Sequence, residues 1–329
     1  MIKYLSLNNI DYSEEPKKSY LNYKIILWSI SFALIFVNLP WEIIKGAEFT
    51  DIENYIRRFK TDFNVNSLIS QGGLLNYITS EYLWAALIVS LKEIGMPILL
   101  IFKSISFFSI FVISYFVFKR SQKFFLTSLL LLNPLLIDFV MSQIRNSFAL
   151  AVIILGMLCH NKWAKIALLI CSTMIHSSSV IIISIIFLLN KITSKRNYRD
   201  FGMLLLIALI FAIGLSVGRE YILTLIGDRR SDITQPQSSI LYSLFWVIYI
   251  LLLLYLKKFI TENIYLKMAF VLIIVFFASV IFGTYASRYL AILLPFLIVA
   301  TMSLNSNNRK FSSGILLFYQ FILFTYWIN

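Results

Sequence analysis

The feature that most constrains this chain is a succession of apolar runs, each about as long as a bilayer is thick. A helix needs roughly 20 mostly apolar residues to cross the hydrocarbon core. Hydrophobic residues make up 59% of the sequence, mean hydropathy is +0.82 and only 14% of residues are charged. Soluble domains carry roughly 25% charged residues. We therefore predict an all-α polytopic integral membrane protein.

The apolar runs predict about 11 transmembrane helices within a single transmembrane domain, residues 1–329. The first twenty or so residues are polar and contain no cleavage site, so we expect the first run to act as a retained signal anchor. Two of the runs, 162–175 and 177–190, are short and are expected to be tilted or surrounded by protein. The candidate spans are 24–43, 97–118, 122–140, 143–159, 162–175, 177–190, 201–217, 239–256, 265–282, 286–303 and 310–327.

The basic residues indicate how these spans are threaded. If the segment SEYLWAALIVSLKEIG (80–95) lies on the membrane as an amphipathic helix and the N-terminus is cytoplasmic, 18 of the 29 Lys and Arg residues lie in cytoplasmic segments. This is the positive-inside distribution. If 80–95 spans the membrane instead, every later basic loop turns outward. We therefore predict a cytoplasmic tail (1–23), a first outer loop (45–96) containing this helix, a second outer loop (218–238) and an outer C-terminus.

The net charge of +13 follows the same short loops between apolar runs. That distribution fits contact with the head-groups of a lipid bilayer, and no nucleic acid is expected as a partner. Cys159 and Cys171 lie in or beside apolar runs, so a disulfide scaffold is not expected. No Cys/His cluster has metal-ligand spacing, and we predict no metal and no cofactor.

Two arginines lie at the outer ends of predicted spans. Arg145 begins the apolar part of QIRNSFALAVIILG, and Arg288 occurs in GTYASRYLAILLPF. A guanidinium binds phosphate through a planar fork of donors, and a helix N-terminus adds unpaired N–H groups. Together they predict a seat for a pyrophosphate carried by a lipid. The competing interpretation is that each arginine only reaches lipid head-groups.

Three further residues could take part in catalysis. His176, in MIHSSSV, could bind phosphate or carry a proton, or it could mark a polar break before a serine-capped helix. Asp51, which shares a helical face with Tyr55, and Glu81 lie in the first outer loop. A carboxylate near a sugar hydroxyl can act as its base. Either acid could equally stabilise the start of a helix.

Weaker candidates lie in the later outer segments and among the aromatic residues. Arg229 and Arg230 in the second outer loop could gather an anionic substrate, although solvated charge is the more common explanation for such a pair. Tyr285, like Tyr82 and Trp84, could stack on a sugar ring.

The order of these motifs resembles the EpsG-like branch of the Wzy polysaccharide polymerases, over about residues 45–303. The similarity rests on QIRNSFALAVIILG, the basic turn HNKWAK, IHSSSVIII and ASRYLAILLPF, with TDIENYIRRF and SEYLWAAL in the first outer loop. One departure is that Ser-Ser-Ser follows His176, without the aromatic residue often found there in the family.

The resemblance implies a polymerase of O-antigen, capsule or exopolysaccharide repeat units in the bacterial inner membrane. Such an enzyme transfers a growing glycan from undecaprenyl pyrophosphate to the non-reducing sugar of the next lipid-linked unit, on the periplasmic face. The resemblance further implies a GT-C-like architecture, a chain-length regulator protein as a partner, and no cofactor. The functional residues that it carries over are Asp51, Glu81, Arg145, His176 and Arg288.

Two other functions remain open at this point. One is a glycosyltransferase that decorates a glycan with single sugars from a lipid-phosphate donor. The other is a flippase for a lipid-linked oligosaccharide. Transporters often have internal repeats and charges at mid-membrane depth, whereas this chain has no clear repeat and its arginines lie at the ends of spans. A purely structural subunit would leave the grouping of Arg145, His176 and Arg288 at one membrane face unexplained.

Overall fold

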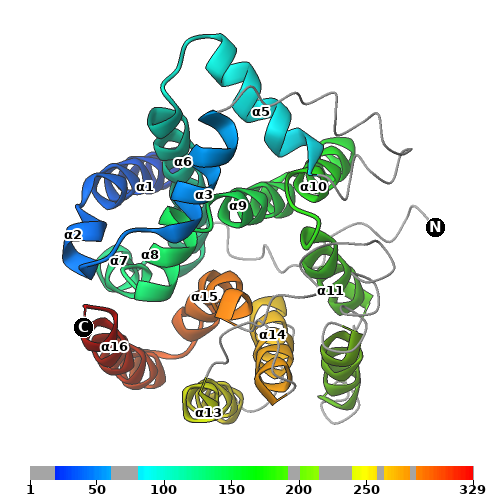
Figure 1. Cartoon of the computed structure of the whole chain (residues 1–329). Helices are drawn as coiled ribbons and strands as arrows, with labels where there is room; N and C mark the ends of the chain where they lie inside the picture. Colours follow the sequence, from blue (N-terminus) through cyan, green and yellow to red (C-terminus); the bar gives the residue numbers. More distant parts are fainter. Residues whose placement is uncertain are drawn as a thin grey trace. The chain divides into compact units, whose positions relative to one another are not determined.

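The computed structural model describes residues 19–60, 81–191, 201–214, 239–257, 263–281 and 287–328. Every regular element in these ranges is a helix, which confirms the all-α prediction there (Figure 1). The second outer loop (218–238) and most of the tail (1–23) lie outside the described residues. The chain forms two compact units, Met1–Ile183 with Gly314–Asn329, and Ser184–Ser313. The single-domain organisation stays a prediction.

The first unit is built around α6, which contacts α1, α3, α5, α7, α8 and α9. Its helices are α1 (Ser19–Asn38), α2 (Trp41–Lys45), α3 (Thr50–Lys60), α5 (Tyr82–Glu93), α6 (Ile98–Ser121), α7 (Phe124–Leu131), α8 (Pro134–Met141), α9 (Ile144–Leu158) and α10 (Lys162–Ile175). The expected span 24–43 ends at Asn38, and Pro40 precedes the short α2. The helices α11 (Ser179–Lys191) and α16 (Ser306–Ile328) each belong partly to this unit.

The expected span 122–140 is two helices, α7 and α8, which meet at an angle of 68°. Pro134 is the first residue of α8, and the Asn133 side chain accepts a hydrogen bond from the Leu135 N–H. Proline has no N–H and clashes with the preceding turn, so an N-capped helix starts afresh there. Gln320 of α16 donates to the carbonyl groups of Leu129 and Leu132 at 2.8 and 2.6 Å. These bonds satisfy backbone groups that the break releases, as an apolar surrounding requires.

Asp138 connects three helices of this unit. Its carboxylate accepts from Lys45 Nζ and from the Trp327 indole N–H, both at 2.9 Å. The Lys45 ammonium also lies 4.9 Å from the centre of the Phe49 ring and 5.6 Å from that of Trp327. The end of α16 is therefore held against α2 and α8 by one carboxylate.

The helices α9 and α10 form an antiparallel hairpin, since they pack together and only residues 159–161 join them. Asn161 caps α10 by accepting from the N–H groups of Trp163 and Ala164. This arrangement puts the first turn of α9 beside the last turn of α10. Arg145 and His176, 31 positions apart in the sequence, therefore lie at the same end of the hairpin.

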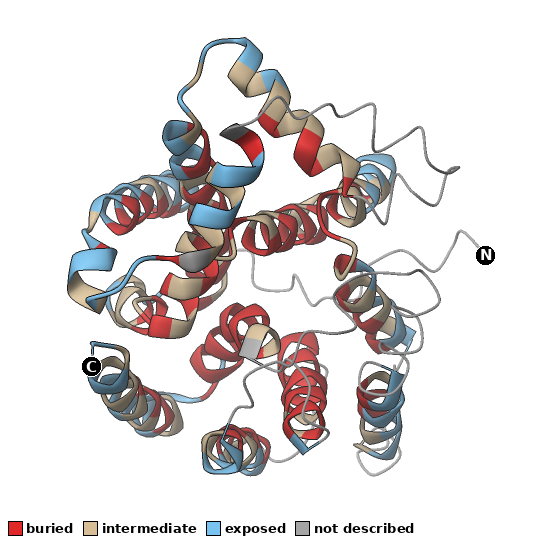
Figure 2. Ribbon diagram, in the orientation of Figure 1, coloured by how far each residue is buried: buried red, intermediate tan, exposed pale blue. Residues whose placement is uncertain are grey.

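The second unit has α14 (Ile264–Ile281) packed against α13 (Ile240–Leu256) and α15 (Ser287–Met302), together with the helix Phe201–Gly214. Nearly every side chain of α14 is buried, as Figure 2 shows. The Tyr249 hydroxyl is 2.9 Å from that of Thr301 and donates to the Ser312 carbonyl. Tyr249 thus links α13 to α15 inside an apolar core.

Three of the described helices, α6, α14 and α16, are long and apolar enough to cross a membrane, and the bent pair α7–α8 could form a fourth span. The other apolar helices have 10–17 residues, and a 15-residue helix is only about 22 Å long. The helices agree with a polytopic membrane protein, and the number of spans stays a prediction. At 12 residues, α5 is about 18 Å long and too short to span.

Candidate functional site

Glu81 is the centre of the candidate site. It directly precedes α5 and has a left-handed backbone conformation, with φ 57° and ψ 44°. Its carbonyl accepts from the N–H groups of Trp84 and Ala85, whereas its side chain makes no capping hydrogen bond. Only 4% of the residue is exposed. A buried carboxylate is costly unless it is paired and hydrogen-bonded.

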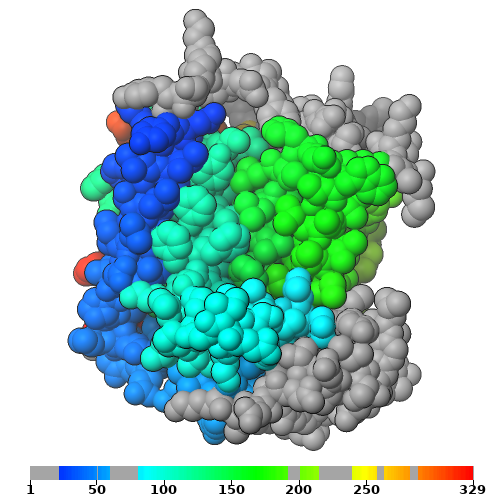
Figure 3. All heavy atoms as spheres, turned by 90° about the horizontal axis from the view of Figure 1, so that it is seen from above, coloured from blue at the N-terminus to red at the C-terminus, as the bar shows by residue number. Residues whose placement is uncertain are grey.

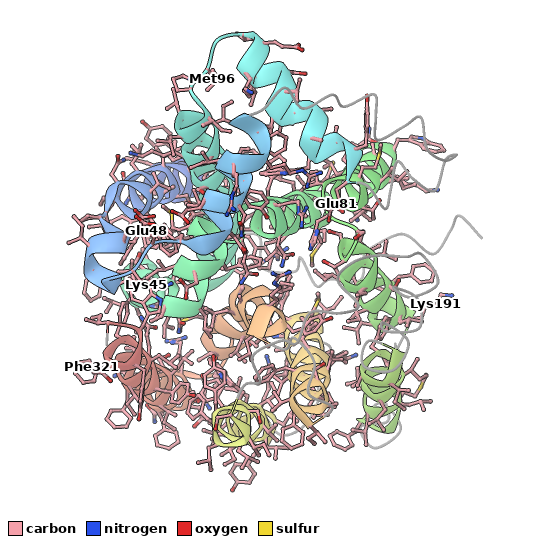
Figure 4. The ribbon with its side chains drawn as sticks, in the orientation of Figure 1. Lys45, Glu48, Glu81, Met96, Lys191 and Phe321 are labelled. Atoms are coloured by element: carbon pink, nitrogen blue, oxygen red, sulfur yellow. The ribbon has the colours of Figure 1, made fainter. Side chains whose placement is uncertain are left out.

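Both oxygens of the Glu81 carboxylate have partners. Oε2 forms an ion pair with Arg145 Nη1, and Oε1 lies 2.5 Å from His176 Nδ1. The side chains of Glu81, Arg145 and His176 are 6%, 15% and 8% exposed. Three residues predicted from separate motifs thus form one buried cluster, which we call the Glu81 cluster. Figure 4 shows Glu81 at the end of α5 that lies next to α9 and α10.

Local structure fixes the two partners of Glu81. Arg145 is the second residue of α9, so its side chain leaves from a helix start. His176 is the C-cap of α10 and has extended backbone. Its N–H bonds the Ser172 carbonyl, and its own carbonyl accepts from the Ser179 N–H. His176 is therefore a break between two helices, as one sequence interpretation held, and also a member of the cluster.

The Arg145 guanidinium uses only part of its fork within the protein. Nη1 is paired with Glu81, while Nε is buried without a hydrogen-bond partner among the described residues. The Nε and Nη2 groups form the other edge of the fork, which suits two oxygens of one phosphate. A buried N–H without a partner costs about 1–3 kcal/mol. This edge is therefore suited to an anionic ligand.

An aromatic ring lies beside the guanidinium. The Cζ atom of Arg145 lies 5.9 Å from the centre of the Tyr55 ring, within the range of a cation–π contact. Tyr55 packs in turn on Trp84 and Phe102, with ring centres 5.7 and 6.0 Å away. The role of Tyr55 beside Arg145 was not predicted. The signal available in the sequence was its position on the apolar face of α3, shared with Ile52, Ile56 and Phe59.

The described helices α3 and α5 both pack against α6 in the first unit. The apolar face of α3 packs into the cluster of buried residues formed with α5, α6 and α9, and its exposed face carries Glu53, Asn54, Arg57 and Arg58. Figure 3 shows α5, in cyan, at the surface.

An open cavity of about 330 Å³ lies at the end of α5 that is remote from Glu81, beside Lys92, Gly95 and Met96. It is therefore separate from the Glu81 cluster.

Two of the remaining predicted residues, Asp51 and Arg288, lie within the described ranges. Asp51 is half-buried in the first turn of α3, one helical turn before Tyr55, and forms no ion pair with the described residues. Arg288 lies in the first turn of α15, in the second unit, so a shared seat with Arg145 stays a prediction. Arg229, Arg230 and Tyr285 lie outside the described residues. Within the described ranges, no three His, Cys, Asp or Glu side chains are grouped as a metal site requires.

The sequence profile of the EpsG family matches residues 25–329. The chain belongs to the EpsG family. Membership of this family of Wzy-like polysaccharide polymerases supports a membrane enzyme of polysaccharide biosynthesis, of the glycosyltransferase type. All five residues that the resemblance singled out lie inside the range matched by EpsG. Searches of curated proteins and of solved structures give no match.

Proposed function

We propose that the chain polymerises oligosaccharide repeat units carried on undecaprenyl pyrophosphate, on the periplasmic face of the bacterial inner membrane. The growing glycan would pass from its lipid carrier to the non-reducing sugar of the next unit, to build O-antigen, capsule or exopolysaccharide. Membership of the EpsG family supports the polymerase. The undecaprenyl carrier rests on the resemblance to the Wzy polymerases, and the face of the membrane rests on that resemblance and on the distribution of basic residues.

The observation that carries this proposal is that, within the described ranges, the Arg145 guanidinium is paired with a protein carboxylate through Nη1 only. Its Nε is buried and has no partner among the described residues, while Glu81 and Tyr55 hold the rest of the guanidinium. An ordinary surface arginine would solvate this edge. An edge whose Nε–H is buried and whose second donor, Nη2, runs parallel to it is instead suited to a phosphate oxygen pair, and pyrophosphate is the leaving group that the proposed reaction requires.

The proposed roles follow from these groups. Arg145 and Arg288 bind the donor pyrophosphate and stabilise the charge that develops as it leaves. A group among Asp51, Glu81 and His176 accepts the proton of the attacking sugar hydroxyl. Arginine charge can neutralise the leaving group, so the proposal needs no metal. A chain-length regulator protein is the proposed protein partner.

The glycan ladder of the host tests the proposal. The gene is deleted and complemented with the wild-type chain, Arg145→Ala or Arg288→Ala, with each protein quantified in the membrane fraction. We expect deletion to leave a single repeat unit on its acceptor, and neither alanine variant to restore the ladder. Glu93→Gln, on the exposed end of α5, serves as a control that should restore it.

Two other results would replace the proposal. A full-length ladder with altered sugars would indicate the decorating glycosyltransferase. Repeat units that accumulate on the cytoplasmic face would indicate the flippase.

A further inference from the structure

Glu81 and His176 are both candidates for the base, and the contact between them distinguishes their roles. We infer that Glu81 is a positioning residue that holds the Arg145 guanidinium and the His176 imidazole in one arrangement, and that His176 accepts the proton of the attacking hydroxyl. This inference rests on the proposed polymerase function and deepens it.

The first argument is that the Glu81 carboxylate is already occupied. Oε2 is paired with Arg145, Oε1 is 2.5 Å from His176, and the side chain is only 6% exposed. A proton added to this carboxylate would remove the negative charge with which Arg145 is paired. In a buried setting, a charge left without its partner is strongly destabilising. Glu81 is therefore poorly placed to take a proton from substrate and well placed to fix two other side chains.

The second argument is the tautomer of His176. An ionised carboxylate only accepts hydrogen bonds, so the contact with Glu81 places a proton on Nδ1 of the ring. The lone pair of the neutral imidazole is then on Nε2. When Nε2 takes a proton, the carboxylate at Nδ1 stabilises the imidazolium that forms, as in other carboxylate–histidine pairs. The Glu81 carboxylate lies against the ring, and Arg145 pairs with the same carboxylate.

The third argument is the backbone at Glu81. Residues other than glycine rarely have a positive φ, and Glu81 is one of only two described non-glycine residues that do. Its conformation starts α5 while the side chain reaches α9 and the end of α10. Rare backbone conformations persist where the surroundings fix them, and they cluster at functional sites.

The proposed step balances without another reactant. The acceptor oxygen forms a bond to the anomeric carbon of the donor sugar, and its proton passes to His176 Nε2. The bond between the anomeric carbon and the pyrophosphate oxygen breaks, and the electron pair leaves with the pyrophosphate. The Nε–Nη2 edge of Arg145 binds that leaving group while Nη1 remains on Glu81.

The test separates binding from turnover in the purified full-length chain in nanodiscs. The variants are Glu81→Gln, His176→Gln, Arg145→Gln and the double variant of Glu81 and Arg145, with Glu93→Gln as the control. The dissociation constant is measured for undecaprenyl pyrophosphate. The turnover number is measured with lipid-linked repeat units extracted from the deletion strain. Size-exclusion profiles establish that each variant is folded.

We expect His176→Gln to lower turnover roughly 100-fold or more, as loss of a general base does, with little change in the dissociation constant. Glu81→Gln should lower turnover and also weaken binding roughly tenfold or more, as Arg145→Gln does, because an amide has one acceptor oxygen and turns an NH2 group towards the other donor. The double variant should bind no more weakly than Arg145→Gln alone, since the two residues act as a unit.

The inference is overturned if Glu81→Gln lowers turnover while binding stays at the wild-type level, because Glu81 would then be the base. It is also overturned if His176→Gln keeps wild-type turnover, which would point to Asp51. If Glu81→Gln does not fold, Glu81→Asp keeps the charge on a side chain too short to reach both partners, and the same pattern is expected. Failure of the wild-type chain to extend the units would reject the polymerase itself, whereas the binding comparison would still test Glu81.

Discussion

At the scale of single residues, Arg145 combines three features that few other side chains could have together. It pairs with Glu81 through Nη1, lies against the Tyr55 ring and keeps a buried Nε–H without a partner in the described ranges. A lysine would supply the charge but only one compact donor centre. The shape of the guanidinium therefore matters as much as its charge.

Arg145→Lys is predicted to fail in ladder complementation nearly as fully as Arg145→Ala. Loss of the bidentate edge and of the Glu81 pair geometry should cost about 1.5–3 kcal/mol of donor binding. The measurement is the ladder on a gel, normalised to the amount of each variant in the membrane. Full restoration by lysine would mean that charge alone is sufficient at this position.

Tyr55→Leu tests the ring beside the guanidinium. Leucine keeps apolar contact with Trp84 and Phe102 but removes the π face, so the cation–π contribution of about 0.5–2 kcal/mol is lost. Affinity for undecaprenyl pyrophosphate should fall roughly 2- to 30-fold. The matched control is Tyr255→Leu, at a tyrosine that is 77% exposed on α13. Equal affinities for the two variants would assign Tyr55 to packing only.

At the scale of elements, the break between α7 and α8 shows how an apolar chain tolerates an interrupted helix. Pro134 and the Asn133 cap make the break, and Gln320 on α16 satisfies two carbonyl groups beside it. Gln320 is 6% exposed, whereas the next residue, Phe321, is 67% exposed. Figure 4 shows Phe321 pointing away from the helices of the first unit.

Gln320→Leu is predicted to destabilise the protein by about 2–3 kcal/mol, because it leaves two half-buried carbonyl groups without their donors. Phe321→Leu, one position along the same helix, should change stability little, since its side chain is exposed. Thermal unfolding in detergent measures both. Equal unfolding midpoints would show that the break does not depend on Gln320.

At the scale of the whole molecule, the threading of the chain through the membrane depends on α5. As a helix of about 18 Å, it is too short to span and buries Trp84, Ala85 and Ile88. If it lies on the outer surface, position 94 is outside and the turn at 160 is inside. If α5 crossed the membrane, both positions would change sides.

Labelling of single cysteines by a membrane-impermeant maleimide tests this threading. Cys159 and Cys171 are first replaced by serine, and cysteine is then placed at Ile94, which is 78% exposed, or at His160. We expect Ile94→Cys to react in spheroplasts and His160→Cys to react only after lysis. The reverse pattern would make α5 a span and turn every later basic loop outward.

Most of the helices were predictable, and the reason is local. A run of apolar residues specifies a helix through its own composition, so the ranges 97–118, 143–159 and 239–256 agree closely with α6, α9 and α13. The span 122–140 was wrong as one helix. Its apolar composition is continuous, and the break depends on Pro134, Asn133 and a donor from α16 that is distant in sequence.

The candidate site was predictable as a set of residues but not as an arrangement. Arginine, histidine and glutamate stand out in apolar sequence because each is costly there without a partner. Nothing in the sequence distinguished Glu81 from Asp51, since both are acids in the same outer loop. Only packing did so, by directing the Glu81 carboxylate towards Arg145 and His176.

The sequence by itself determined that this chain is helical, that its apolar helices are suited to a membrane, and that it contains the motifs of the EpsG family. Those properties follow from composition, charge distribution and short motifs, which act over a few turns of chain. The tertiary structure alone decided that Glu81 meets His176 across 95 positions of sequence and that Tyr55 lies against Arg145. Such pairs depend on how α3, α5, α9 and α10 pack together, because side chains far apart in sequence meet only after their helices have docked.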